Sequence, residues 1–203
     1  MNTQPGKATV KKFQTHLINW YHNEFRDLPW RRTQDPYAIW ISEIMLQQTQ
    51  VKTVIPYYER FLQRFPTIKD LATCDLSDLL KIWEGLGYYA RARNMKKAAQ
   101  MILDQHQGEF PHTLEQVKAL PGIGPYTAAA ILSIAFERDL AVVDGNVNRV
   151  LCRVFRLNID PKSTSGKKVI HELTQQLLAR HQAGAYNQAL MELGALLCTP
   201  RPP

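Results

Sequence analysis

The chain has 203 residues, 45% of them hydrophobic, which suits one domain or two small interlocked lobes with a sizeable core. A formal net charge of +7 and a pI of about 9.4 favour an anionic partner, most often nucleic acid, although a basic protein without such a partner has the same composition. No segment is long and apolar enough to cross a membrane, and we expect no signal peptide in the polar N-terminal residues.

The cysteines argue against two further classes of protein. Cys74, Cys152 and Cys198 are odd in number, lie far apart in the sequence and form no CxxC pair. This pattern indicates neither a disulfide framework nor a zinc site. We therefore expect a reducing intracellular compartment.

Hydrophobic periodicity is helical almost throughout the chain. The first predicted helix carries its apolar side chains on one face, and these are Phe13, Leu17, Trp20, Tyr21 and Phe25. The sequence Leu-Pro-Trp at 28–30 ends this helix. Asp35-Pro36 begins the next helix, with proline in its first turn.

Capping residues mark the starts of later helices. Thr67 and Thr113 are each followed three residues later by an acid or an amide, as in capping boxes, and Asp75 is expected to cap a third helix. Only residues 140–143, Leu-Ala-Val-Val, resemble a strand, and one short run cannot form a sheet. We therefore predict an all-α fold of about ten short helices.

A glycine-containing turn interrupts the helical pattern at residues 120–132, LPGIGPYTAAAIL. Gly122, Ile123 and Gly124 turn the chain between two helices. Glycine permits backbone conformations that other residues resist, and free amides at a helix N-terminus bind phosphate. Tight helix–helix turns also use glycine, but the longer pattern L-P-G-I-G-x-x-T-A, which includes Thr127, favours a helix-hairpin-helix motif that contacts DNA phosphates without reading sequence.

A second glycine turn lies at residues 84–94, EGLGYYARARN. Two glycines bend the chain, two adjacent tyrosines follow, and two arginines come next. Aromatic rings stack on bases or enter between them, and arginines reach phosphates. The alternative is a pair of core tyrosines with two solvated arginines. The residues concerned are Gly85, Gly87, Tyr88, Tyr89, Arg91 and Arg93.

Two carboxylates occupy contrasting environments in the sequence. Glu43 is the only charged side chain from Pro36 to Val51, and burial would favour its protonated form. Asp144 precedes a helix-like run, where amide hydrogen bonds and the helix dipole favour the ionised form. Such a pair suits cleavage of a glycosidic bond, which needs an acid for the leaving group and a carboxylate for the cationic sugar. The alternatives are an ion pair of Glu43 with an arginine such as Arg31, and a plain helix cap at Asp144.

Several motifs together resemble the adenine DNA glycosylases, the MutY family of the helix-hairpin-helix DNA glycosylase superfamily. These motifs are SEIMLQQTQV at 42–51, GLGYYARARN at 85–94, LPGIGPYTAAAI at 120–131 and VDGNVNRV at 143–150. The similarity extends from LPWR at 28–31 to LGALLCTPR at 193–201. It covers the N-terminal catalytic core of the family.

The resemblance implies an endonuclease III-like, all-α DNA glycosylase fold. Residues 1–203 would form one catalytic region with two helical lobes and a cleft between them. Residues from about 30 to 140 would form a six-helix lobe that contains the hairpin. Residues 1–29 and 141–203 would form the second lobe.

The resemblance also implies base excision repair, in which adenine mispaired with 8-oxoguanine or guanine is flipped out and removed. Glu43 matches the acid that protonates adenine N7, and Asp144 matches the carboxylate that stabilises the sugar cation. Tyr126 and Asn146 match residues that assist them. The positions that match the adenine pocket are Trp30, Arg31, Leu46 and Gln188. The positions that match DNA contacts are Gln48 and Tyr88, which enter the duplex, and Thr49, Arg91, Gly122, Ile123, Gly124 and Thr127.

One position separates this chain from its strand-cleaving relatives. The endonuclease III-type enzymes carry a lysine nucleophile in the second helix of the hairpin, and Tyr126 stands at the matching position. Because no amine is present there, no Schiff base can form, and we predict a monofunctional enzyme that leaves an abasic site. The alternatives are an endonuclease III-like glycosylase/lyase and a non-catalytic DNA-binding fragment.

Two parts of the family are missing from this sequence. Family members normally hold a 4Fe-4S cluster through four cysteines after the last helix, whereas this chain has only Cys198, which alone cannot hold a cluster. The domain that reads 8-oxoguanine is also missing. We therefore expect no cofactor in this chain. The expected partner is duplex DNA with an adenine mispair, and we expect a monomer without membrane association in a bacterial cytoplasm, at the nucleoid.

Overall fold

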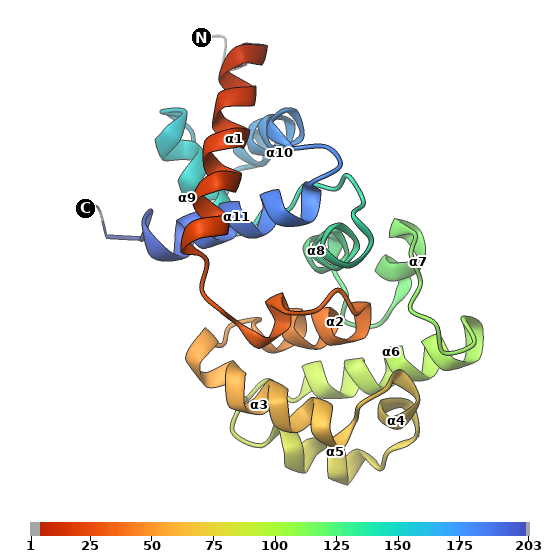
Figure 1. The fold of residues 1–203 in the computed structure, drawn as a ribbon. Helices are drawn as coiled ribbons and strands as arrows, with labels where there is room; N and C mark the ends of the chain where they lie inside the picture. The colour runs from red at the N-terminus through yellow and green to blue at the C-terminus, as the bar shows by residue number, and fades with distance from the viewer. Residues whose placement is uncertain (1–4, 202–203) are drawn as a thin grey trace. The chain divides into compact units, whose positions relative to one another are not determined.

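The computed structural model describes residues 5–201, and these form eleven α-helices and one short 3-10 helix (Figure 1). In chain order the elements are α1 (Lys7–Glu24), η1 (Pro29–Arg31), α2 (Pro36–Met45), α3 (Val51–Arg64), α4 (Ile68–Thr73), α5 (Leu76–Trp83), α6 (Ala90–Gln105), α7 (Leu114–Ala119), α8 (Pro125–Phe136), α9 (Gly145–Val154), α10 (Thr164–Leu177) and α11 (Ala183–Leu196). Residues 5–201 contain no strand, which confirms the all-α prediction. None of the helices in this part of the chain has the length and apolar character that a membrane crossing requires.

The strand-like residues 140–143 adopt an irregular conformation. The backbone N–H of Val142 donates to the side-chain oxygen of Asn187 at 3.3 Å, and the carbonyl of Leu140 accepts from the side-chain nitrogen of the same residue at 2.8 Å. A single amide side chain therefore satisfies backbone groups that a neighbouring strand would pair in a sheet.

Side-chain caps begin several helices, as their local sequences predict. Asp35 accepts from the backbone N–H of Tyr37 at the start of α2, Thr67 begins α4 in a complete capping box, and Thr113 caps α7. The prediction for Asp75 was wrong in part. This residue stands at the N-cap of α5, but only its backbone carbonyl accepts a hydrogen bond from the helix.

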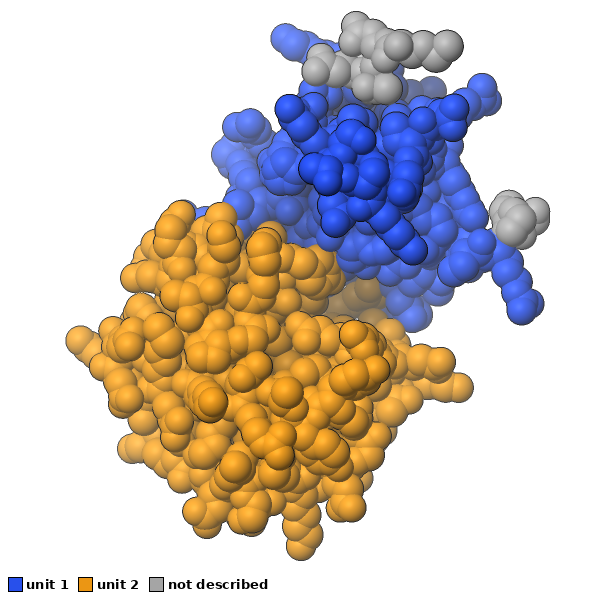
Figure 2. Space-filling view, turned by 180° about the vertical axis from the view of Figure 1, so that it is seen from behind, with its two compact units in different colours: residues 1–26, 137–203 blue, residues 27–136 orange. Residues whose placement is uncertain are grey.

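The described residues fall into two compact units (Figure 2). One unit is continuous and comprises Asp27–Phe136, which includes η1 and α2 to α8. The other is assembled from both ends of the chain, because it contains α1 together with the residues from Glu137 onward. We refer to them as the continuous unit and the two-segment unit.

Helix α2 is the interior helix of the continuous unit. Every residue from Tyr37 to Met45 is buried, and α2 packs against α8 and α3. A helix that is apolar on all sides is stable only when other elements surround it. Aromatic contacts also pack this unit: the ring of Phe61 on α3 meets those of Phe65 and Trp83 at centroid distances of 5.2 and 6.2 Å. The last turn of α2, which carries Glu43, is therefore held in a packed frame.

Helix α11 organises the two-segment unit, where it packs against α1 and α9. The approach to α9 is close at Gly194, because a Cβ atom placed there would lie only 2.5 Å from the Cβ of Asn146. Glycine is required wherever two backbones come this near. The fully buried side chains around these helices include Val147, Val150, Leu151, Ile170, Leu177, Tyr186, Ala189 and Leu190.

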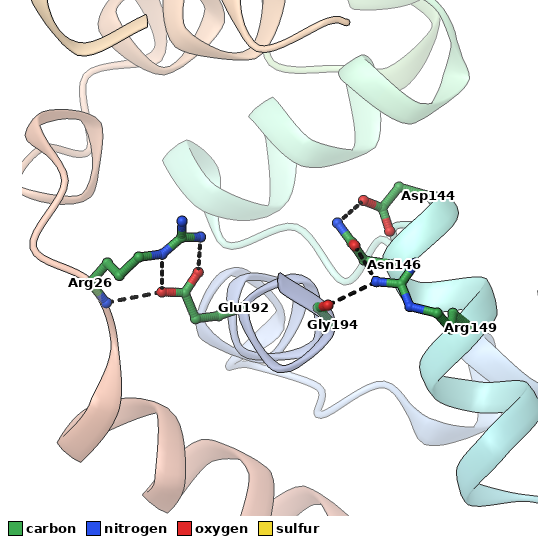
Figure 3. A network of polar contacts seen from close by, with 6 residues as sticks. All are labelled: Arg26, Asp144, Asn146, Arg149, Glu192 and Gly194. Carbon is green, nitrogen blue, oxygen red and sulfur yellow. Dashed lines mark hydrogen bonds and ion pairs between the residues drawn. The ribbon is translucent and has the colours of Figure 1, made fainter. Parts of the chain in front are cut away.

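Buried polar groups of α11 also hold the two chain segments that leave this unit. Glu192 is 1% exposed and accepts from Arg26 three times, from the backbone N–H at 2.9 Å, from Nε at 2.8 Å and from Nη2 at 2.6 Å (Figure 3). Asn187, which is fully buried, holds the other segment through Leu140 and Val142. Because a buried charge needs a paired and hydrogen-bonded partner, Arg26 is fixed to α11 immediately before the continuous unit begins.

Candidate functional site

Glu43 lies in the last part of α2, where 8% of its surface is exposed. The sequence predicted an acid in apolar surroundings, and its neighbours Ile44 and Met45 are fully packed, with exposures of 2% and 1%. Leu46 follows as the C-cap of α2 and is half-buried. The predicted protonated state of Glu43 stays a prediction.

Two other predicted pocket residues lie in η1, which packs against α2. Trp30 is buried, and its ring meets that of Tyr58 edge-to-face at a centroid distance of 5.4 Å. Arg31 is half-buried. Proline at the first position of η1 starts this short turn, so that its two functional candidates are presented at fixed places beside α2.

The polar run after α2 forms a tight turn, residues 46–50, which we call the glutamine turn. Gln48 is exposed and has φ +57°, a left-handed conformation that few non-glycine residues adopt. Thr49 is half-buried, and its backbone N–H donates to the carbonyl of Leu46 at 3.3 Å. The side chain of Gln47 instead points into the unit, where Nε2 donates to Oγ1 of Thr127 at 3.4 Å.

The second glycine turn, residues 84–89, which we call the tyrosine turn, has a related conformation. Gly85 and Gly87 have φ +96° and +70°, and Tyr88 also lies in the left-handed region at +48°. Tyr88 is 63% exposed, so it is not a core tyrosine. Tyr89 is 38% exposed. Each of the two turns thus presents one exposed side chain from a left-handed residue.

Arg91 is predicted to contact DNA, and in the structure its guanidinium points inward. Its guanidinium is half-buried and is directed at backbone carbonyls of the continuous unit, with distances from 2.6 to 3.3 Å. Burial lowers the pKa of this arginine from its ordinary value. Arg93, two residues further along α6, is exposed.

The predicted hairpin is present as α7, a turn at residues 120–124, and α8. Gly122 has φ +81°, and a Cβ atom there would lie 2.9 Å from the Cβ of Asn94, so conformation and space both require glycine. Ile123 is buried and ties the turn to the core. Gly124 differs, because a Cβ atom there would meet nothing within 4 Å. This second glycine borders open space, which suits close approach of a partner's backbone.

The two hairpin residues beyond the turn lie at different depths. Tyr126 is half-buried near the start of α8. Thr127 is 2% exposed, and its hydroxyl meets the side chain of Gln47. Thr127 is therefore almost entirely buried where α8 packs against α2, and its predicted DNA contact stays a prediction.

Asp144 lies in the two-segment unit as the N-cap of α9. Its Oδ1 accepts from the backbone N–H of Val147 at 2.7 Å. Its Oδ2 accepts from Nδ2 of Asn146 at 3.0 Å (Figure 3). The cap was predicted correctly, but its electrostatic consequence was not. Burial raises the pKa of Asp144 above its ordinary value, although these hydrogen bonds and the charge of Arg149 lower it. Desolvation therefore outweighs the stabilisation from the helix start.

Arg149 extends this contact into a network that sequence reasoning missed. Its Nη2 donates to Oδ1 of Asn146 at 2.7 Å and to the carbonyl of Gly194 at 2.8 Å (Figure 3). Its Nε donates to the carbonyl of Cys198 at 2.6 Å. The signal available was the spacing, because residues three apart on a helix lie on one face. The contribution of Gly194 has no local signal, since it depends on the packing of α11 against α9.

Cys198 does not form part of a metal site in the described residues. Within residues 5–201 no group of three or more histidine, cysteine, aspartate or glutamate side chains is placed to hold a metal ion. The Sγ atom lies 3.4 Å from Nη1 of Arg153. A 4Fe-4S cluster requires four thiolate ligands, so the residues present do not fit such a cluster.

The predicted catalytic residues are divided between the two units. Glu43 and Tyr126 belong to the continuous unit, and Asp144 and Asn146 belong to the two-segment unit. Gln188, predicted for the adenine pocket, is half-buried on α11, where its Nε2 donates to the carbonyl of Gly184 at 3.4 Å.

Sequence comparison supports the resemblance on which these roles depend. The profile of the HhH-GPD superfamily of base excision DNA repair proteins matches residues 41–182. An adenine DNA glycosylase of Rattus norvegicus is 47% identical over 205 residues, which cover 97% of this chain and 40% of the rat protein. The predicted similarity to adenine DNA glycosylases is therefore confirmed, and the chain spans about 40% of that relative's length.

Solved structures agree with the observed fold. A thermostable thymine-DNA glycosylase is 30% identical with a TM-score of 0.86, and the match covers 97% of this chain and 90% of that one. A trapped endonuclease III–DNA covalent intermediate is 21% identical with a TM-score of 0.81, and the match covers 98% of this chain and 91% of that one. The predicted endonuclease III-like fold is thus confirmed. The chain belongs to the HhH-GPD superfamily of base excision DNA repair proteins.

Proposed function

We propose that this chain is the catalytic core of an adenine DNA glycosylase. It hydrolyses the N-glycosidic bond of adenine mispaired with 8-oxoguanine or guanine in duplex DNA, and it acts as a monomer. The observation that carries the proposal is the 47% identity to an adenine DNA glycosylase over 97% of this chain. The buried acid on α2 and the capping carboxylate on α9 supply the two groups that glycosidic cleavage needs.

Glu43 is the proposed general acid. Its proton passes to N7 of the flipped adenine, and the electron pair of the C1′–N9 bond leaves with the base. Apolar packing around the last turn of α2 favours a carboxyl group that holds its proton until the base arrives. A general acid of this kind contributes about 10²–10⁴-fold to the rate.

Asp144 is the proposed partner of the sugar cation. When the bond breaks, positive charge develops at C1′ and the ring oxygen, and an ionised carboxylate stabilises it. Hydrogen bonds from Val147 and Asn146 fix the position of this carboxylate. Water then adds at C1′ and loses a proton, which leaves an abasic site.

Two surfaces of the continuous unit are proposed to hold the DNA. The hairpin turn binds a backbone phosphate through amides near Gly124, where no side chain blocks the approach. Gln48 and Tyr88 enter the duplex and fill the space that the flipped adenine leaves. Both side chains are exposed, and neither carries a charge that would repel phosphate.

Tyr126 supports a monofunctional reaction. A phenol forms no Schiff base with the opened sugar, so the strand stays intact until alkali cleaves the abasic site. Borohydride should therefore trap no covalent complex between this protein and DNA. A trapped complex would assign the chain to the glycosylase/lyase class instead.

The test is single-turnover adenine release from a duplex with adenine opposite 8-oxoguanine, read with and without hot alkali. We expect cleavage only after alkali, and we expect Glu43→Gln to lower the rate by about 10²–10⁴-fold because it removes the proton and keeps the shape. Glu172→Gln, at an exposed position on α10, is the matched control. Full activity in Glu43→Gln would disprove the assigned mechanism. Duplex binding without release in the unchanged protein would identify a non-catalytic DNA-binding fragment.

A further inference from the structure

The glutamine turn and the tyrosine turn share an unusual backbone feature. Gln48 and Tyr88 both have positive φ, +57° and +48°, and both are exposed. A side chain disfavours this conformation sterically, so such a residue keeps it only where the surroundings fix the backbone. The two turns are distant in the sequence, and each needs a source of that restraint.

One guanidinium supplies restraint to both turns. Nη1 of Arg91 donates to the carbonyl of Gln47 at 2.6 Å, and Nη2 approaches the carbonyl of Gly87 at 3.3 Å. These two carbonyls belong to the residues immediately before Gln48 and Tyr88. Arg91 therefore holds the peptide that leads into each left-handed residue.

The remaining contacts of Arg91 extend the link on both sides. They reach the carbonyls of Ile44 (2.9 Å), Met45 (3.0 Å) and Leu86 (3.0 Å) and Oγ1 of Thr49 (3.3 Å). The carbonyl of Ile44 also accepts from the backbone N–H of Gln47 at 3.3 Å, so Arg91 adds a second donor there and a donor to the carbonyl of Met45. The same side chain thus joins the end of the helix that carries Glu43 to the two turns.

Aromatic rings fix the plane of the guanidinium. Its central carbon lies 5.3 Å from the ring centroid of Trp83 and 5.5 Å from that of Tyr88. Trp83 is fully buried and also donates from Nε1 to the carbonyl of Gly87 at 3.0 Å. A planar cation with a fork of donors suits this site, whereas a lysine ammonium cannot reach both turns at once.

We propose that Arg91 is a positioning residue that holds Gln48 and Tyr88 together in the arrangement that enters the DNA duplex. The proposal rests on the proposed function, which assigns those two side chains to the space left by the flipped base. It replaces the expected phosphate contact of Arg91 with an interior role. The geometry links the turns that carry both entering side chains to one guanidinium. Removal of the guanidinium should therefore disturb the conformations of both turns together.

The first test compares Arg91→Lys and Arg91→Ala with Arg93→Ala, a variant of an exposed arginine on the same helix. Hydrogen exchange without DNA should become at least about tenfold faster in residues 46–50 and 84–89 of both Arg91 variants, because charge-assisted hydrogen bonds to these turns are lost. Arg93→Ala should leave both turns unchanged. Unchanged exchange in Arg91→Lys would overturn the proposal.

The second test separates positioning from phosphate binding through salt dependence. Each phosphate contact contributes about 0.9 to the slope of log affinity against log salt concentration. Arg91→Ala should weaken binding to a duplex with adenine opposite 8-oxoguanine by about tenfold or more and leave the slope unchanged. A slope that becomes shallower by about 0.9 would instead identify Arg91 as a phosphate contact.

A measurement on the unchanged protein covers the case in which both Arg91 variants unfold. The backbone N–H of Thr49 donates within the glutamine turn, to the carbonyl of Leu46, and the backbone N–H of Leu86 donates from the tyrosine turn to the carbonyl of Trp83 at the end of α5. If one guanidinium holds both turns, these two amides should open together and exchange with equal protection. Independent protection would overturn the proposal. Failure of the unchanged protein to release adenine would overturn the proposed function and leave the exchange result intact.

Discussion

The two proposed catalytic carboxyls are positioned by different physical means. Glu43 lies within α2, whose residues from Tyr37 to Met45 are all buried, so packing of a whole helix fixes the backbone that carries it. Asp144 precedes α9, where the backbone of Val147 and the side chain of Asn146 hold it through hydrogen bonds. One carboxyl is therefore carried by a buried helix, and the other stands at the start of a helix.

The comparison explains why two acids in one protein suit different tasks. Apolar packing disfavours a charge and suits a group that must donate a proton. A carboxylate that must face a cation needs donors that keep it ionised and oriented. Burial nevertheless raises the pKa of Asp144. The hydrogen bonds to its carboxylate lower that pKa and so offset part of the effect of burial.

The largest expected effect on the rate of adenine release comes from removal of the charge of Asp144. Asp144→Asn keeps an acceptor for the start of α9 but no longer stabilises a cationic sugar. We expect single-turnover adenine release to fall by about 10²–10³-fold. The free energy of unfolding in urea should change by less than about 1 kcal/mol, because asparagine also caps helices well.

Two further variants check the assignment of that loss. Asp144→Ala removes the cap as well and should cost about 1 kcal/mol of stability. Asp104→Asn, at an exposed position on α6, should change neither the rate nor the stability. A rate for Asp144→Asn within about tenfold of the unchanged protein would contradict the electrostatic role.

The next largest expected effect comes from substitution of glycine by alanine, at one position in each unit. At Gly194 a Cβ atom would lie 2.5 Å from the Cβ and 3.1 Å from the Cα of Asn146, so alanine must push α11 away from α9. Overpacking costs about 1–3 kcal/mol. Alanine's higher helix propensity, worth about 1 kcal/mol, offsets part of this cost. We expect Gly194→Ala to lower the free energy of unfolding by about 1 kcal/mol and to slow adenine release.

Gly124→Ala is the matched change in the continuous unit. A Cβ atom there meets nothing, so the free energy of unfolding should stay within about 0.5 kcal/mol. Affinity for duplex DNA, measured by fluorescence anisotropy at fixed salt, should fall because the new methyl group obstructs a phosphate.

A stable Gly194→Ala protein with unchanged activity would show that the contact of α11 with α9 does not support Asp144.

Local sequence rules predicted the helical class and most helix starts. The caps at Thr67, Thr113 and Asp144 follow from residues only three positions apart, and the structure confirms them. Gly122 was also predictable, because it sits in a turn whose backbone favours glycine. Such features need no knowledge of which helices meet.

Apart from the local cap predicted at Asp75, the expectations that differ from the structure involve partners that are distant in the sequence. Arg91 resembled an outward-facing arginine, but carbonyls from α2 and the glutamine turn accept its hydrogen bonds. No sequence pattern singled out Gly194, because its close approach to Asn146 depends on the packing of α11 against α9. The pKa of Asp144 was misjudged because the cap is local, whereas burial depends on tertiary packing. Residue type alone thus did not predict side-chain direction.

The smallest expected effect concerns the pH dependence of the reaction. Asn146→Ala removes the donor 3.0 Å from Oδ2 of Asp144 and also one acceptor of Arg149. Because this hydrogen bond lowers the pKa of Asp144 against the effect of burial, its loss should raise that pKa further. At a given acidic pH a smaller fraction of the carboxylate is then ionised. The acidic limb of the single-turnover rate profile should therefore move to higher pH.

The profile also distinguishes tuning of Asp144 from general damage. If Asn146 acts through ionisation of the carboxylate, the rates of Asn146→Ala and the unchanged protein should converge as pH rises above the acidic limb. Asn19→Ala, at an exposed position on α1, should leave the limb in place. A rate lowered equally at every pH would mean that Asn146 orients the carboxylate without tuning it. The polar network around Asp144 would then only hold its carboxylate in place, as the packed frame of α2 holds the backbone of Glu43. The two carboxyls would differ in how they are positioned and not in how their ionisation is controlled.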